Sequence, residues 1–474
     1  MLSTINLNSY FCTVITVILL SIYSPSYAIS EGSSELDGEL HDLIQQLKLT
    51  NNPASDIDIP DIQSPIAQLG MKLFYSKTLG GDQTTACVTC HHPMLGGGDG
   101  LSLPIGVDSQ DPDILGPGRR TQSNSWVKVP RNAPTTFNIA LWKKHMFHDG
   151  RVKKLDAHAI HTPDVALDTA DALGGENLVQ AQARFPITSP EEMRGEFLSD
   201  AMTQTVRRSL AKRLQKRWEH QFRHAFKDTT SPLEDLVTEQ NISEAIATYE
   251  RSQVFVKAPW HEYVAGNLQA ISTSAKRGAV LFFNSQESGG AGCVSCHSGD
   301  FFTDEEFYNT AMPQIGEGKA KNEQDKNKDD LGCFLVTGKP EDAYRFRTPS
   351  LLNVEVTGPW GHSGAYTSLE AVTRHMLDPK QALKHYDSQQ LTQPNIDLAQ
   401  LPSNHAKLLR SDIDVMPSPQ NSEQVVQDLV AFMKTLTDPC VKSRECLSPW
   451  IPDQNSNDPD RNLLHGLAQS GQRL

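Results

Sequence analysis

The sequence lacks an excess of positive charge, and after its first residues it lacks any apolar run long enough to cross a bilayer. Lys and Arg number 43 against 57 Asp and Glu, so the formal net charge at pH 7 is −14. This balance argues against binding to a nucleic-acid backbone and suits a macromolecular partner with a basic face. An acidic balance is also a common route to solubility, so it does not identify the partner.

One apolar run lies near the start, from Phe11 to Tyr23, and it is too short to span a bilayer comfortably. It is followed by small residues at Ser26 and Ala28, a pattern typical of a signal peptide cleaved after Ala28. No Lys or Arg precedes the run, so an uncleaved anchor remains an alternative. We predict that residues 1–28 are an export signal and that the mature protein is periplasmic, without a membrane span.

The chain carries two Cys-x-x-Cys-His motifs about two hundred residues apart. In such a motif the two thiols form thioethers to a haem and the adjacent histidine ligates its iron. A zinc ribbon or a redox Cys-x-x-Cys is the rival interpretation, which export and the immediate histidines disfavour. The expected residues are Cys87, Cys90 and His91 for one covalently bound c-type haem, and Cys293, Cys296 and His297 for the other.

The surroundings of the two motifs repeat each other in residue type and in spacing. The chain of 474 residues also exceeds the roughly 250 to 300 at which a single core usually stops growing. We therefore predict two domains, residues 29–255 and 256–474. The matched residues are Arg131, Pro134, Asn138, His148, Gly150 and Leu155 in the first half and Arg347, Pro349, Asn353, His362, Gly364 and Leu369 in the second.

The expected fold class is all-α, with long loops and one small helical unit around each haem, because helices must cover both faces of a porphyrin. Helical periodicity is visible at residues 201–226, 241–251 and 422–436, the last with Asn421 or Ser422 as its N-cap. Of the remaining cysteines, Cys440 and Cys446 form a plausible disulfide in an exported protein, which leaves Cys333 single.

Together these stretches resemble the bacterial di-haem cytochrome c peroxidase and MauG family over nearly all of the mature chain. The resemblance implies a first haem that reacts with peroxide and a second that relays electrons. The matching segments, besides the two haem motifs, are residues 69–74 (LGMKLF), 131–135 (RNAPT), 147–151 (FHDGR), 189–193 (SPEEM), 263–266 (YVAG), 346–351 (FRTPSL) and 359–364 (PWGHSG).

The resemblance also implies axial and distal residues. Met376, seven residues beyond Leu369, matches the sixth ligand of the second haem, and its neighbour His375 is the competing candidate. A thioether ligand raises the potential, which suits an electron relay. Glu192 matches the distal acid-base residue of the first haem, where a carboxyl transfers a proton between the two peroxide oxygens.

The sequence departs from the family pattern at three places. His148 stands where the family has a tryptophan between the haems, and His158 stands where it has a distal glutamine. The family's iron-blocking histidine has no counterpart, because no histidine occurs between Pro93 and Lys144; the first haem is therefore expected to be open without reductive activation. His145 and His161 lie near these positions as further, less favoured ligand candidates.

The family holds a calcium ion between its domains, and Asn132, Thr357 and Pro359 occupy the matching places. Oxygen ligands of this kind suit calcium, although turn formation alone would explain an Asn and a Pro.

The sequence thus predicts a periplasmic peroxidase that reduces hydrogen peroxide with electrons from a small redox protein, such as a monohaem cytochrome c or a cupredoxin. Two alternatives stay open: a MauG-like enzyme that oxidises residues of a protein substrate, and a di-haem electron carrier without enzymatic activity. A homodimer is a further expectation from the resemblance.

Overall fold

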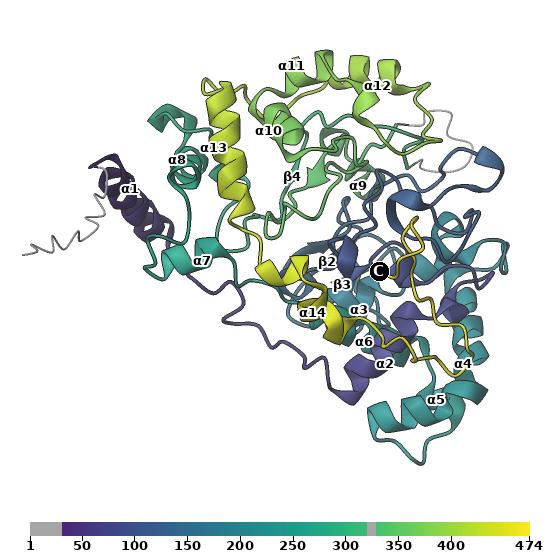
Figure 1. Ribbon diagram of the computed structural model, residues 1–474. Coiled ribbons are helices and arrows are strands. Elements are labelled where there is room, and N and C mark those ends of the chain that lie inside the picture. Colours follow the sequence, from purple (N-terminus) through teal and green to yellow (C-terminus); the bar gives the residue numbers. More distant parts are fainter. Residues whose placement is uncertain (1–30, 320–328) are drawn as a thin grey trace, which may run out of the picture.

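The computed structural model describes residues 31–319 and 329–474, so the predicted export signal lies outside the described residues. The chain is mostly helical, with long loops and two small antiparallel sheets (Figure 1). The helices are α1 (Glu31–Leu47), α2 (Pro65–Tyr75), α3 (Leu178–Gln182), α4 (Thr203–Phe226), α5 (Leu233–Leu236), α6 (Glu239–Arg251), α7 (Pro259–Val264), α8 (Thr273–Phe283), α9 (Phe334–Thr337), α10 (Leu369–Leu377), α11 (Pro379–Lys384), α12 (Leu401–Leu408), α13 (Glu423–Lys434) and α14 (Arg444–Leu447). The strands are β1 (His145–Met146), β2 (Val152–Lys154), β3 (Ile160–His161), β4 (Phe307–Tyr308) and β5 (Phe346–Arg347).

The first helical unit is built on a close crossing of α2 and α6. Helix α2 begins where the Ser64 side chain accepts a hydrogen bond from the backbone N–H of Ala67. At the crossing, a Cβ added to Gly70 would lie 1.8 Å from the carbonyl oxygen of Ala245. Only glycine permits this approach, because any side chain would collide with the backbone of α6. Helix α4 packs on the same core with buried Trp218.

The second helical unit repeats this crossing with α8 and α13. The Ser272 side chain caps α8, and a Cβ added to Gly278 would lie 1.9 Å from the carbonyl oxygen of Asp428 in α13. Ser422 caps α13 by accepting from Val425 N–H, so of the two predicted caps the structure uses Ser422. In both units the first helix leads into a short 3₁₀ turn that carries the haem motif.

Two matched asparagines meet at the junction of the units. Asn138 and Asn353 are both buried and both adopt left-handed backbone conformations, with φ of 60° and 63°, which asparagine tolerates better than most residues. Their side-chain amides donate to the same acceptor, the carbonyl oxygen of Phe255, at 3.1 and 3.0 Å. The duplication expected from the sequence is therefore a structural pseudo-symmetry.

The two ends of the chain cross over to the opposite units. Helix α1 packs on α8 and contributes Leu40, Leu43 and Ile44 to the second core, at one end of the molecule in Figure 1. After α13 the chain runs back over the first unit, where the carbonyl oxygen of Trp450 accepts hydrogen bonds from two tyrosines and Leu464 joins the core. Each unit is thus completed by a segment distant in sequence.

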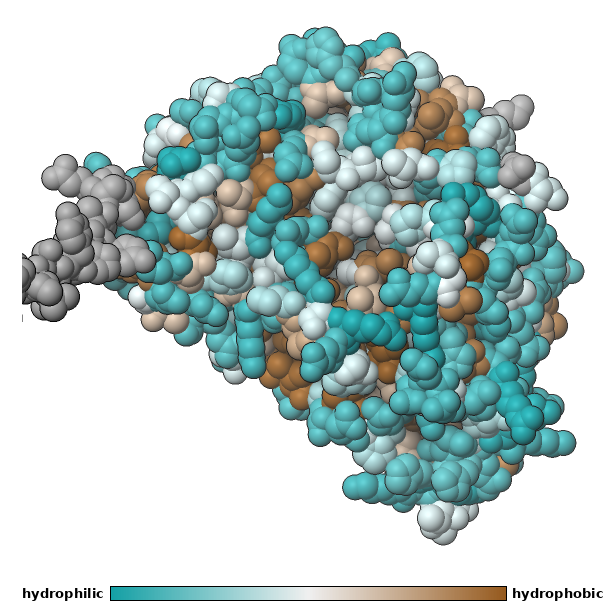
Figure 2. Space-filling view, in the orientation of Figure 1, coloured by the Kyte–Doolittle hydropathy of each residue, from teal (hydrophilic) through white to brown (hydrophobic). Residues whose placement is uncertain are grey.

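The predicted helices form with small shifts: 201–226 begins at Thr203, 241–251 begins at Glu239, and 422–436 spans Glu423–Lys434. The predicted disulfide between Cys440 and Cys446 is present, and Cys333 is free and buried. Among the described helices none is both long and apolar enough to span a membrane. The face shown in Figure 2 is mainly hydrophilic, with apolar side chains in separate patches.

Candidate functional site

A cavity of about 950 Å³ extends between the two helical units. Its wall includes both Cys-x-x-Cys-His motifs, one from each unit, and a volume of this size is at the upper end for cofactor pockets. All four motif cysteines are free of disulfides. Burial raises the pKa of the Cys87 thiol far above its usual range and that of Cys293 to about 12. The four thiols are therefore held neutral beside the cavity.

The two motif histidines are oriented in the same way. The Nδ1 atom of His91 lies 3.1 Å from the carbonyl oxygen of Gly97, and that of His297 lies 3.0 Å from the carbonyl oxygen of Phe302. A backbone acceptor at Nδ1 fixes the tautomer that leaves Nε2 available for a metal. Burial lowers the pKa of both imidazoles, which favours the neutral, ligating form. The residues present thus fit two haems attached through thioethers.

Helix α10 presents Met376 to the cavity and turns His375 away from it. Met376 is part of the cavity wall. His375 is fully buried on another face of the helix, where Nδ1 lies 2.8 Å from the Tyr366 hydroxyl and Nε2 lies 2.8 Å from the carbonyl oxygen of Thr310. Both nitrogens of His375 are therefore engaged elsewhere, as the helical spacing of the two residues requires.

Glu192 reaches the cavity from a π-helical turn, Pro190–Arg194. A single π-helical turn is a frequent feature of functional sites. Burial raises the pKa of the Glu192 carboxyl, and the positive charges of Arg151 and Lys319 oppose this shift. Within the described part of the chain its carboxyl accepts no hydrogen bond, so it remains available to a ligand.

A buried network of ions lies next to Glu192. Arg131 donates to Asp149 at 2.6 Å and to both oxygens of Asp330, which comes from the second half of the chain, at 2.6 and 2.7 Å. Arg151 also pairs with Asp149, at 3.0 Å. Burial raises the pKa of Asp330, but Arg131 outweighs this effect and the net pKa is lowered. The network joins the two halves at the cavity wall through charge-assisted bonds.

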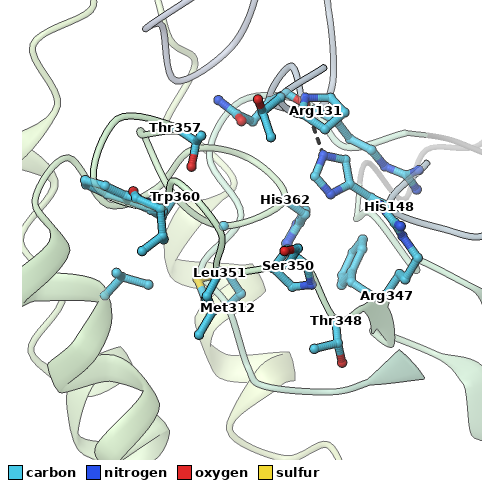
Figure 3. Close-up of a pocket in the computed structure, with 18 of the residues that line it drawn as sticks. Arg131, His148, Met312, Arg347, Thr348, Ser350, Leu351, Thr357, Trp360 and His362 are labelled. Atoms are coloured by element: carbon cyan, nitrogen blue, oxygen red, sulfur yellow. Dashed lines mark hydrogen bonds between the residues drawn. The ribbon is translucent and has the colours of Figure 1, made fainter. Parts of the chain in front are cut away.

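His148 and His362 both line the cavity and lie near each other in Figure 3. Nε2 of His148 is 3.1 Å from the carbonyl oxygen of Asn132, and burial lowers its pKa to about 3. His362 stacks on Phe346, with ring centroids 3.8 Å apart, and burial lowers its pKa to about 4. Both imidazoles are therefore neutral at physiological pH.

The structure does not bring the other candidate histidines to the cavity. His158 is exposed on the loop between β2 and β3, with its backbone N–H bonded to Asp156. His145 packs against Phe307, and His161 is buried with Nδ1 near the carbonyl oxygen of Thr169. Of the four clustered histidines, only His148 belongs to the wall.

The three expected calcium residues all belong to the described wall of the cavity. Asn132, Thr357 and Pro359 all line the cavity, and Thr357 faces it in Figure 3. The Asn132 side-chain nitrogen donates to the carbonyl oxygens of Leu101 and Ser102, at 2.9 and 3.2 Å. This orientation leaves the amide oxygen without a hydrogen bond among the described residues.

Several wall residues were not assigned a role from the sequence. Trp142 packs edge-to-face on Phe301 of the second half at 5.0 Å, and Arg347 stacks 3.3 Å from the Trp142 ring centroid. Lys319 and Met312 also line the cavity. No local pattern marks Trp142, Lys319 and Met312, because each comes from a loop whose position depends on the packing of the two halves. Arg347 lies in β5 and belongs to the repeated pattern, which gave no hint of its contact with Trp142.

Comparison with known proteins places this arrangement in a family. Residues 64–269 match the sequence profile described as di-haem cytochrome c peroxidase. The methylamine utilization protein MauG of Methylorubrum extorquens is 30% identical over 368 residues, which cover 78% of this chain and 77% of the relative. A cytochrome-c peroxidase, IdrP1, of Denitromonas iodatirespirans is 30% identical over 326 residues, covering 64% and 70%.

Solved structures share the fold. A MauG-like protein associated with microbial copper homeostasis aligns with a TM-score of 0.55 at 21% identity, over 83% of this chain and 97% of that protein. The diheme peroxidase BthA of Burkholderia thailandensis aligns with a TM-score of 0.51 at 19% identity, over 82% and 89%. With two haem motifs on one cavity and relatives of this kind, the chain belongs to the di-haem cytochrome c peroxidase and MauG family of oxidoreductases.

Proposed function

We propose that this protein reduces hydrogen peroxide to water in the periplasm, using electrons from a small redox protein. The observation that carries the proposal is the unlike chemistry that the two halves present to one cavity. The first half contributes the carboxyl of Glu192, which accepts no hydrogen bond within the described part of the chain, and the second contributes the thioether of Met376. Two covalently bound haems would supply one iron for peroxide and one for electron storage.

Glu192 performs the proton transfer in this proposal. Its raised pKa reflects burial and makes the carboxyl a better proton carrier near neutral pH. The carboxylate accepts a proton from hydrogen peroxide and returns it to the departing oxygen. As the O–O bond breaks, the departing oxygen takes the bonding electron pair and leaves as water. Two electrons and two further protons complete the conversion to two water molecules.

Met376 serves the electron-relay side. Together with His297 it would hold the iron of the second haem, and the thioether would raise the potential of that haem. The engaged nitrogens of His375 support this choice. The donor is a small protein such as a monohaem cytochrome c or a cupredoxin, and a basic face on it would complement the net charge of −14.

A calcium ion between the halves is part of the same proposal. Among the described residues the amide oxygen of Asn132 accepts no hydrogen bond, and Thr357 and Pro359 line the same cavity. Both observations support the calcium ion, because calcium prefers oxygen ligands.

A MauG-like oxidation of a protein substrate is the second candidate. The absence of any histidine between Pro93 and Lys144 favours it, because a first haem that needs no activation suits an enzyme whose substrate is another protein. The similarity to the Methylorubrum protein supports the same alternative.

The test is steady-state oxidation of reduced cytochrome c by hydrogen peroxide, with the haem-loaded wild type and Glu192→Gln. We expect the variant to lose about 10²- to 10⁴-fold in rate, the range for general acid-base groups. Glu191→Gln is the matched control, because Glu191 is adjacent in sequence but lies outside the cavity wall. If the wild type fails to oxidise every electron donor tested but modifies a co-purified protein, that result would establish the second candidate instead.

A further inference from the structure

The family resemblance implies a polar group opposite Glu192 on the distal side of the first haem. The family position for that group is His158, but His158 is exposed and outside the cavity wall. The described wall carries four cations, and the charges of three of them, Arg151, Lys319 and Arg131, act on Glu192. The fourth, Arg347, stacks on the ring of Trp142. The three cations near Glu192 are therefore the candidates for a group that faces the same ligand.

Both arginines already bond to buried carboxylates. The guanidinium of Arg131 donates to Asp149 and to both oxygens of Asp330. Arg151 pairs with Asp149 at 3.0 Å and lies 3.4 Å from the ring centroid of Phe147, a close cation–π contact. Neither group can turn toward the cavity without breaking buried interactions.

Lys319 is bound far more loosely. Among the described residues its ion pair is with Asp149, at 3.9 Å between Nζ and Oδ2, and that carboxylate already accepts closer bonds from both arginines. The Lys319 side chain keeps 36% of its surface accessible, and Glu192 and Lys319 lie within electrostatic range of each other. A flexible ammonium with three donors can therefore turn toward a ligand beside Glu192.

We propose that Lys319, supplied by the second half of the chain, is the hydrogen-bond donor that faces Glu192 in the distal pocket of the first haem and holds the departing oxygen of hydrogen peroxide. The inference rests on the proposed function. Negative charge develops on the departing oxygen as the O–O bond breaks, and an ammonium turned toward that oxygen stabilises the charge. Lys319 keeps its proton, and Glu192 delivers the one that converts the departing oxygen to water.

The surroundings of Lys319 give the proposal a pH signature. Burial lowers the pKa of Lys319 to about 8; Arg151 and Arg131 act in the same direction, while Asp149 and Glu192 oppose it. Since the pKa is lowered, the ammonium is present below about pH 8 and is lost as the pH rises through that value. Any contribution of Lys319 to anion binding must disappear over the same range.

The test uses fluoride, a small anion that binds an open ferric haem, titrated into the haem-loaded full-length protein and followed by the high-spin absorption bands. We expect Lys319→Met to weaken fluoride binding by roughly 10- to 100-fold below pH 8, the range for one charged hydrogen bond. Lys319→Arg should retain tight binding, without the decline that the wild type shows near pH 8. Lys128→Met is the matched control, since Lys128 is exposed and outside the wall.

The outcomes distinguish the role of Lys319 from the peroxidase activity on which it depends. Equal fluoride affinity and equal pH profiles in wild type and Lys319→Met, with wild-type thermal stability in both, would overturn the role of Lys319 and leave the peroxidase proposal standing. A wild type that binds no fluoride and shows no high-spin haem would overturn the proposed function, and the role of Lys319 with it.

Discussion

The two halves of this protein share one scaffold and differ in what faces the cavity. In each, a glycine lets two helices cross in near contact, a 3₁₀ turn carries the haem motif, and a backbone carbonyl orients the histidine. Beyond that scaffold the first half presents the carboxyl of Glu192 to the cavity and the second presents the thioether of Met376 on α10. The ion network of Arg131 joins the two halves. The duplicated scaffold holds the two haem motifs in matching places, and the loops and α10 give the two sides of the cavity different chemistry.

Removing the Met376 thioether is the most direct test of the difference between the two halves. We expect Met376→Ala to convert the second haem from low spin to high spin and to lower its potential on the order of 0.1 V, a modest part of the roughly 0.8 V that axial ligands span. Electron paramagnetic resonance and redox titration measure both changes. Met312→Ala removes another thioether of the wall and should leave both unchanged; the reverse result would make Met312 the ligand.

Removing the cation between the halves should cost the most stability. Arg131→Met leaves Asp330 buried without its partner, and breaking a buried ion pair in this way costs about 3–5 kcal/mol. Chemical denaturation of the haem-loaded protein measures the loss. Arg120→Met is the control, because Arg120 bonds only to nearby carbonyl groups at a partly exposed site. A change below about 1 kcal/mol in Arg131→Met would mean that the halves do not depend on this network.

The shared scaffold predicts equal penalties at its two helix crossings. Gly70→Ala and Gly278→Ala each force a Cβ against a backbone carbonyl, and we expect each to cost about 1–3 kcal/mol or more. Gly38→Ala, in α1, meets nothing within 4 Å and should instead stabilise its helix by about 0.5–1 kcal/mol. Thermal unfolding compares all three. Unequal penalties at Gly70 and Gly278 would show that the two crossings are not equivalent.

Acid should weaken the junction by a smaller amount. The folded pKa of Asp330 is lowered by Arg131, so its contribution is present above the unfolded value of about 3.9 and is lost as the pH falls below it. Each pH unit in that range costs at most about 1.4 kcal/mol for this carboxyl. Melting temperatures at pH 6, 4 and 3 measure the slope. In Arg131→Met, Asp330 is a buried carboxyl without its partner, so lowering the pH should protonate it and stabilise the variant. If the melting temperature of the variant falls with pH as that of the wild type does, the pairing of Arg131 with Asp330 is contradicted.

Local patterns explain the features that sequence reasoning found. The haem motifs, the disulfide and the α4, α6 and α13 segments each depend on residues close together in the chain, so their spacing is informative. Helices α2 and α8 were not assigned from periodicity, although residues 69–74 lie in α2, because their crossing glycines interrupt the apolar pattern. The crossing of α1 and of the C-terminal segment to opposite units leaves no local trace either.

In the candidate site, too, some residues could be predicted from the sequence and others depended on the tertiary structure. The sequence left His375 as a competitor of Met376 for the iron, and the hydrogen bonds of both His375 nitrogens in the structure support Met376. Family position pointed to His158, yet the β2–β3 loop holds it in solvent.

By itself the sequence predicted where two haems would attach, because thioether chemistry needs two cysteines and a histidine within five consecutive residues. It also determined that the scaffold is duplicated, since matched spacings produce matched local folds. Only the tertiary structure decided what surrounds the first haem. Glu192 and Lys319 come from different halves of the chain and meet at one wall through long-range packing, which no local pattern of residues encodes.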